Sequence, residues 1–187
     1  MHTISDNSSH WQLKDVIFLA LIALFFGVIY QIWGFSYTFI AATPLKPFAN
    51  DATLGVWLMA GPLAGRLIPK PGSAILGEFL AATIEMFLFS QWGAMNLVSG
   101  LIQGLGAEIG FASTKYQQRP KTNLLISALM MTILTFIWDL FQSGYLAYHL
   151  PMLALLFIIR FISTGFFAGI LVNLIEKMVT KTGAIRK

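Results

Sequence analysis

Five ionisable side chains lie inside stretches of the sequence that are otherwise apolar enough to cross a lipid bilayer. They are four acids and one base, namely Glu78, Glu85, Glu108, Asp139 and Arg160. An ionised group in hydrocarbon is costly, so each of these side chains is a candidate functional residue. Because the acids outnumber the base by three, the set predicts a cavity that takes a positively charged molecule.

Three polar side chains are expected to share one layer in the outer half of the membrane. At a rise of about 1.5 Å per residue, Glu85 and Asp139 reach this layer from the inner side and Gln103 reaches it from the outer side. The other residues predicted to line the cavity are aromatic or amide side chains, namely Trp57, Trp92, Asn96, Trp138, Gln142 and Tyr145.

These residue types predict a flat, nitrogen-rich cation as the ligand. A carboxylate supplies the counter-charge, and each aromatic face adds about 0.5–2 kcal/mol of cation–π attraction. The carboxamides of Gln103 and Asn96 offer a donor and an acceptor together, so they can read the edge of an aminopyrimidine.

Structural roles compete with ligand binding for the remaining charges. Glu108 and Arg160 are expected near the midplane, where they can pair with each other, because an unpaired buried charge is expensive. Glu78 lies close to the cytoplasmic face, where a long side chain can reach water. Both acids stay candidates for the ligand site.

Some of the aromatic residues have an alternative location at the membrane surface. Trp33 and Tyr37 fall at the outer end of the first apolar stretch, where they fit an interfacial aromatic belt. Trp57 fits the belt and the cavity equally well.

The composition indicates an integral membrane protein and excludes several other classes. The 187 residues are 57% hydrophobic and 11% charged, with a mean hydropathy of +0.73, whereas soluble domains carry about 25% charged residues. There is no cysteine, and His2, His10 and His149 are too scattered to form a metal site. No P-loop motif and no long basic run occur. We therefore expect that the protein is not an enzyme and that it binds no cofactor, metal ion or nucleic acid.

The apolar stretches predict an all-α fold, a single bundle of six transmembrane helices with short tails. The tails are residues 1–13, which are polar, and 180–187, which are basic, and the membrane domain is 14–179. Ten of the twelve basic residues fall on one side of the bundle, which predicts that both termini are cytoplasmic. The longest connection is expected at 34–50, and a tight turn at 69–72. The predicted spans are 16–33, 51–68, 73–90, 95–114, 123–148 and 152–176.

Small residues predict where helices touch, because close approach of backbones drives association in lipid. The fourth span carries Gly100, Gly104, Gly106 and Gly110, which suit packing inside the bundle. In the first span Ala20, Ala23 and Gly27 suit either internal packing or contact with another membrane subunit.

Four blocks of the sequence resemble the YkoE family, the substrate-binding S components of bacterial energy-coupling factor (ECF) transporters. They are WLMAGPLAG at 57–65, KPGSAILGEFLAA at 70–82, SQWG at 90–93 and NLVSGLIQGLGAE at 96–108. The resemblance implies capture of thiamine, or of its hydroxymethylpyrimidine moiety, from outside the cell. It also implies a membrane coupling (T) subunit, for which Ala20, Ala23 and Gly27 would be the docking face, and two cytoplasmic ATPase subunits.

Two other functions remain open from the residues alone. A standalone carrier for cations, coupled to protons, would use Glu78, Glu85 and Glu108 as a relay, although no internal repeat of the kind common in such carriers is visible. A scaffold subunit would have all of its buried acids paired within the protein.

Overall fold

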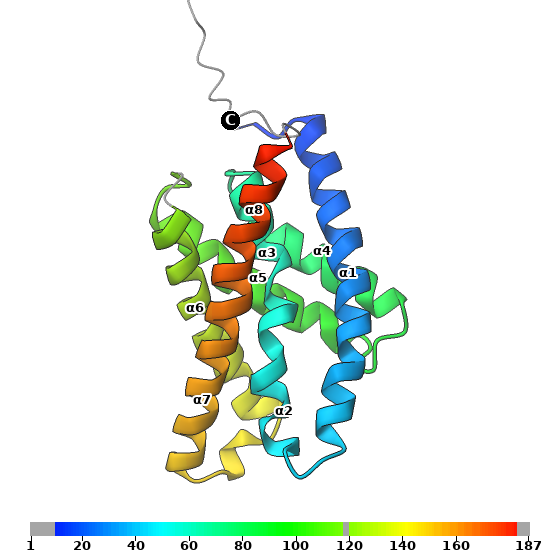
Figure 1. Cartoon of the computed structure of the whole chain (residues 1–187), viewed down its shortest axis with the longest axis vertical. Helices are drawn as coiled ribbons and strands as arrows, with labels where there is room; N and C mark the ends of the chain where they lie inside the picture. Colours follow the sequence, from blue (N-terminus) through cyan, green and yellow to red (C-terminus); the bar gives the residue numbers. More distant parts are fainter. Residues whose placement is uncertain (1–9, 118–119, 183–187) are drawn as a thin grey trace, which may run out of the picture.

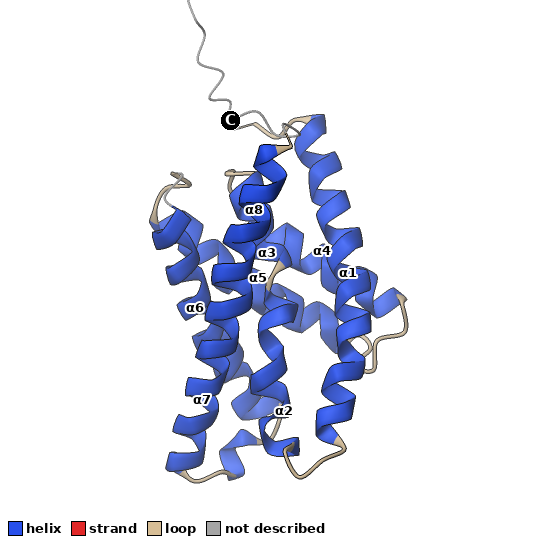
Figure 2. Cartoon of the chain, in the orientation of Figure 1, coloured by secondary structure: helices blue, strands red, loops and turns tan. Residues whose placement is uncertain are grey.

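The computed structural model describes residues 10–117 and 120–182, and within these ranges the chain is helical and contains no strand (Figure 2). This confirms the predicted all-α fold class. The helices are α1 (Leu13–Ala41), α2 (Lys46–Thr53), α3 (Ala60–Leu67), α4 (Ser73–Phe87), α5 (Met95–Ser113), α6 (Pro120–Gln142), α7 (Leu150–Thr164) and α8 (Val172–Lys181).

Two of the helical rods are composite. A 3-10 turn, Leu54–Leu58, joins α2 to α3, and a π-helical segment, Gly165–Leu171, joins α7 to α8. The 3-10 turn lies against the last turn of α7, since a Cβ atom on Gly55 would clash with the Ser163 carbonyl oxygen. Only glycine allows this close approach of the 3-10 turn to α7.

The rods run up and down a common long axis (Figure 1). The start of α1 and the end of α8 lie at one end of the bundle, and the α1–α2 and α6–α7 connections lie at the other. Helices α4 and α5 cross the bundle more obliquely, and the turn between them projects from its side. The cavity described below is enclosed by these oblique helices and the upright ones.

Three helical stretches are long and apolar enough to cross a membrane, namely Leu13–Ala41, Lys121–Gln142 and Leu150–Lys181. The other three predicted spans coincide with helical rods that are shorter or broken, at 46–67, 73–87 and 95–113. Six crossings therefore stay a prediction, as does the orientation of the chain.

Several of the described basic residues lie at the end of the bundle where α1 begins and α8 ends. Lys70 Nζ, in the α3–α4 turn, lies 2.6 Å from Asp15 Oδ2 at the start of α1 and donates to the His10 carbonyl. Three of the basic residues counted above (Arg119, Arg186 and Lys187) lie outside the described residues, as do parts of both predicted tails, 1–9 and 183–187.

The glycines of α5 pack as predicted, on two opposite neighbours. A Cβ atom on Gly100 or Gly104 would meet Ala82 or Ile75 of α4, within 2.8 Å. On the other side, Gly106 lies against Met131 of α6 in the same way. Helix α5 is thus held between α4 and α6 at backbone contact distance.

The predicted docking face on α1 is corrected by the same kind of contact. Gly27 lies against Ile84 and the Ala81 carbonyl of α4, and Ala23 is only 1% exposed. Both residues are used to pack α1 against the chain itself, so they are not accessible to another subunit. Ala20 is exposed.

The connections differ from expectation in one place. Helix α1 continues to Ala41 and α2 begins at Lys46, so the predicted long connection at 34–50 is reduced to four residues. Pro47 stands in the first turn of α2, where its missing N–H group costs nothing. The tight turn at 69–72 is confirmed, with Gly72 at a φ of +85°.

The α5–α6 contact predicts different outcomes for two glycine substitutions. Gly106→Ala would place a methyl group 2.7 Å from the Met131 Cα atom, and such overpacking costs about 1–3 kcal/mol. We expect a lower thermal midpoint in detergent, by about 2–4 °C for each kcal/mol. Gly169→Ala is the control, because nothing lies within 4 Å of its added methyl group. Equal midpoints for the two variants would contradict this packing.

Candidate functional site

A cavity of about 330 Å³ lies between α1, α2, α4, α5 and α6. Each helix presents one face to it, as the spacing of Asn96, Ser99 and Gln103 on α5 shows. Of the eleven side chains predicted to bind a ligand, nine line this cavity, namely Trp57, Glu85, Trp92, Asn96, Gln103, Trp138, Asp139, Gln142 and Tyr145. The structure thus brings together residues from four separate segments, while their role in binding stays a prediction.

Glu85 is buried beside a group of aromatic rings that line the cavity, Trp57, Trp92 and Tyr37, called the aromatic box below. The carboxylate is held by the Trp57 indole, whose Nε1 donates to Glu85 Oε1 over 3.0 Å. The Trp92 ring meets Trp57 and Tyr37 edge to face, at centroid distances of 5.2 and 5.3 Å. Glu85 is 2% exposed and belongs to none of the ion pairs formed among the described residues. Its negative charge therefore has no basic partner in this part of the chain.

The amide side chains on α5 leave hydrogen-bonding capacity open toward the cavity. Asn96 is 6% exposed, and its Nδ2 atom has no hydrogen-bond partner within the described residues. A buried donor without a partner costs about 1–3 kcal/mol. An acceptor on a bound molecule would remove this cost.

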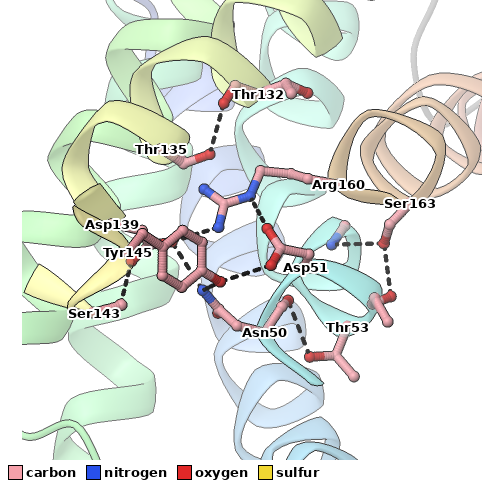
Figure 3. A network of polar contacts seen from close by, with 12 residues as sticks. Asn50, Asp51, Thr53, Thr132, Thr135, Asp139, Ser143, Tyr145, Arg160 and Ser163 are labelled. Carbon is pink, nitrogen blue, oxygen red and sulfur yellow. Dashed lines mark hydrogen bonds and ion pairs between the residues drawn. The ribbon is translucent and has the colours of Figure 1, made fainter. Parts of the chain in front are cut away.

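The second acid of the cavity, Asp139, is part of an ionic network (Figure 3). Arg160 Nη2 lies 2.6 Å from Asp139 Oδ2, and Arg160 Nε lies 2.7 Å from Asp51 Oδ1. The Tyr145 hydroxyl donates to Asp51 Oδ2 over 2.6 Å, and Asn50 Nδ2 donates to Asp139 Oδ2 over 2.8 Å. The network ties α2, α6 and α7 together beside the cavity. Asp139 thus has a basic partner, which it shares with Asp51, whereas Glu85 has none among the described residues.

The predicted pair between Glu108 and Arg160 is wrong. Glu108 instead accepts hydrogen bonds at the start of α4, from the backbone N–H groups of Gly72, Ala74 and Ile75 at 2.6, 3.0 and 3.3 Å. A carboxylate is stabilised there because the first N–H groups of a helix have no partner inside it and carry partial positive charge.

The Tyr116 hydroxyl completes this cap, donating to Glu108 Oε1 over 2.6 Å. Burial, together with the adjacent carboxylate, raises the pKa of Tyr116 above its ordinary value, so the hydroxyl keeps the proton that it donates. Glu108 does not line the cavity.

Glu78 has a corresponding role at the start of α3. Its Oε2 accepts from the Gly61 N–H group and its Oε1 accepts from the Tyr30 hydroxyl, both over 2.7 Å. The Tyr30 oxygen in turn accepts from the Ala60 N–H group. Glu78 is fully buried, which corrects the expectation that it reaches water, and it does not line the cavity. With Glu78 and Glu108 each bound to a different helix start, the hypothetical relay through Glu85 is not assembled.

Two residues that prediction placed elsewhere belong to this region. Tyr37, assigned to an interfacial belt, lines the cavity against Trp92. Asp51, taken as the first residue of a span, is fully buried and paired. Pro47 could have indicated that Asp51 lies inside a helix. Proline is common in the first helical turn, so it favours a helix that begins near residue 47 and not at the predicted residue 51.

Comparisons with known proteins agree on one family. A protein-family model described as "ABC-type cobalt transport system, permease component" matches residues 14–134. The "Putative HMP/thiamine permease protein YkoE" of Bacillus subtilis (strain 168) is 31% identical over 175 residues, covering 94% of this chain and 87% of that protein. A crystal structure of an S-component of an ECF transporter superimposes with a TM-score of 0.88 at 30% identity, covering 93% of this chain and 88% of the other.

The Arg160 network predicts a large stability loss when its base is removed. Arg160→Met leaves two buried carboxylates facing each other, and breaking a buried ion pair costs about 3–5 kcal/mol. We expect thermal unfolding in detergent, followed by circular dichroism, to shift down by about 6 °C or more. Lys181→Met is the control, because Lys181 is exposed at the end of α8. An Arg160→Met midpoint as high as that of the control would contradict the role of the network.

Proposed function

Since this chain belongs to the YkoE family, the S components of energy-coupling factor transporters, we propose that it captures thiamine or its hydroxymethylpyrimidine moiety from outside the cell. It is a transport subunit and not an enzyme. Its partners in this proposal are a membrane coupling (T) subunit and two ATPase subunits, which would supply the energy, because the sequence has no P-loop of its own.

The observation that carries this proposal is that Glu85 is a buried carboxylate without a basic partner among the described residues. Of the two acids that line the cavity, Asp139 is paired with Arg160, and Glu85 has no basic partner among the described residues. A cation seated in the aromatic box would supply the missing positive charge. The faces of Trp57, Trp92 and Tyr37 would add to the attraction, since each cation–π contact contributes about 0.5–2 kcal/mol.

The amides fit the second half of such a ligand. An aminopyrimidine presents a ring nitrogen that accepts and an amino group that donates. Asn96 Nδ2, which lacks a partner, would donate to the ring nitrogen, and the Gln103 oxygen would accept from the amino group. The cavity volume of about 330 Å³ lies at the lower end of the range for small-molecule sites, which suits one compact two-ring molecule.

The proposed orientation has the cavity open to the outside of a bacterial cell membrane. Lys14 lies at the start of α1, Lys181 at the end of α8, and Lys70 pairs with Asp15 beside them, and the positive-inside rule assigns this end of the bundle to the cytoplasm. The membrane domain would then be 14–179, with six crossings and both termini in the cytoplasm. The cavity, lined by the start of α2 and the end of α6, would face the opposite side.

The aromatic box predicts a fluorescence response. Three of the five tryptophans, Trp57, Trp92 and Trp138, line the cavity, so thiamine should quench the emission of the purified protein at micromolar concentration or below. Trp92→Phe should remove part of this quenching and Trp11→Phe should not, because Trp11 does not line the cavity. If neither quenching nor calorimetric heat is detected at micromolar thiamine, the proposed substrate is wrong.

The uncompensated carboxylate predicts the strongest single effect on affinity. Glu85→Gln keeps the shape of the side chain and removes its charge, so thiamine binding should weaken at least about tenfold, or about 1.4 kcal/mol, by isothermal titration calorimetry. Asp15→Asn is the matched control, since Asp15 lies at the far end of α1 from the cavity and pairs with Lys70. An unchanged affinity in Glu85→Gln would remove Glu85 from the site.

A further inference from the structure

The charged side chains that line the cavity are of both signs. Among the lining residues that the structure describes, the acids are Glu85 and Asp139 and the base is Lys46. Arg160 pairs with Asp139 and with Asp51, whereas Glu85 and Lys46 belong to no ion pair in the described ranges. Of the charged side chains that line the cavity, one acid and one base are therefore without an ion-pair partner among the described residues.

These two charges are well separated along the cavity. Glu85 is buried against Trp57, and Lys46 is exposed as the first residue of α2, at the end of the bundle where α1 and α2 connect. Trp57 follows Lys46 by eleven residues on the same rod, which corresponds to about 18 Å of helix axis. The acid thus lies at a buried part of the cavity lining and the base at an exposed part.

A simple cation uses only one of these charges. It would be attracted by Glu85 and repelled by Lys46 as it entered. A molecule with a cationic or hydrogen-bond-donating head and an anionic tail would satisfy both. The start of α2 contributes partial positive charge beside Lys46, and an ammonium group is a common partner of phosphate.

We propose that Lys46 binds the phosphate of a phosphomonoester of the substrate, so that the cavity accepts the phosphorylated form of a hydroxyl-bearing, cationic heterocycle as well as the free alcohol. This inference rests on the proposed function and adds to it a second ligand class and the residue that selects it. Binding is the whole of the step, and no bond of the ester is made or broken.

The test compares two ligands on the full-length protein in detergent, thiamine and thiamine monophosphate, by isothermal titration calorimetry. The quantity measured is the ratio of their dissociation constants, ester over alcohol. In the unmodified protein this ratio should be one or less, and it should rise with added salt, because ions screen an exposed pair over about 10 Å at 0.1 M. Lys46→Gln should raise the ratio about fivefold, the effect of a partly exposed ion pair, and Lys46→Glu should raise it further.

The control is Lys181→Gln, a lysine at the opposite end of the molecule, which should leave the ratio unchanged. A ratio above ten in the unmodified protein, or a Lys46→Gln variant with the unmodified ratio, would overturn the assignment of Lys46 while leaving thiamine binding in place. Failure of both ligands to bind the unmodified protein would instead overturn the proposed function.

Discussion

In apolar surroundings buried charges and helix ends need hydrogen-bonding or charged partners. The buried acids of this chain differ in which kind of partner they have. Glu78 and Glu108 accept hydrogen bonds from the first N–H groups of α3 and α4. Asp51 and Asp139 share Arg160. Glu85, bound by the neutral indole of Trp57, has no basic partner among the described residues. Four of these five buried carboxylates thus have a structural role that their partners explain. Glu85 is the exception, and the contacts of this chain alone distinguish it.

The cavity owes its shape to a helix that is not continuous. The 3-10 turn Leu54–Leu58 separates α2 from α3, and Trp57, within that turn, reaches Glu85 from there. A break inside a bundle exposes backbone N–H groups that must be satisfied by protein groups. Glu78 and Tyr30 satisfy those of Gly61 and Ala60 immediately after the break. Glu78, which does not line the cavity, therefore supports the helix break that brings Trp57 to Glu85 in the cavity.

The sequence predicted the depth of residues along the bundle axis better than it predicted which neighbouring helix each side chain faces. Residue counting placed Glu85, Gln103 and Asp139 at one depth, and all three line the cavity. Depth alone cannot say which neighbour a side chain faces, so Glu108 was paired with Arg160 when it points to the start of α4. The glycines of α5 did carry directional information, because only a close neighbour explains them. Asp51 was missed because the start of α2 was placed too late, which put a buried carboxylate at a surface.

The π-helical segment between α7 and α8 sets which way the last helix faces. Arg160 and Glu176, sixteen residues apart, are both buried, and Glu176 pairs with Arg66 of α3. In a regular α-helix that separation would turn the two side chains about 160° apart, toward nearly opposite sides. One extra residue accommodated in the wider turn reduces the angle to about 60°. The segment Gly165–Leu171 therefore rotates α8 about its axis relative to α7. As a result, Arg160 and Glu176 face the bundle from one side of the rod, where Arg160 pairs with Asp51 and Asp139 and Glu176 pairs with Arg66.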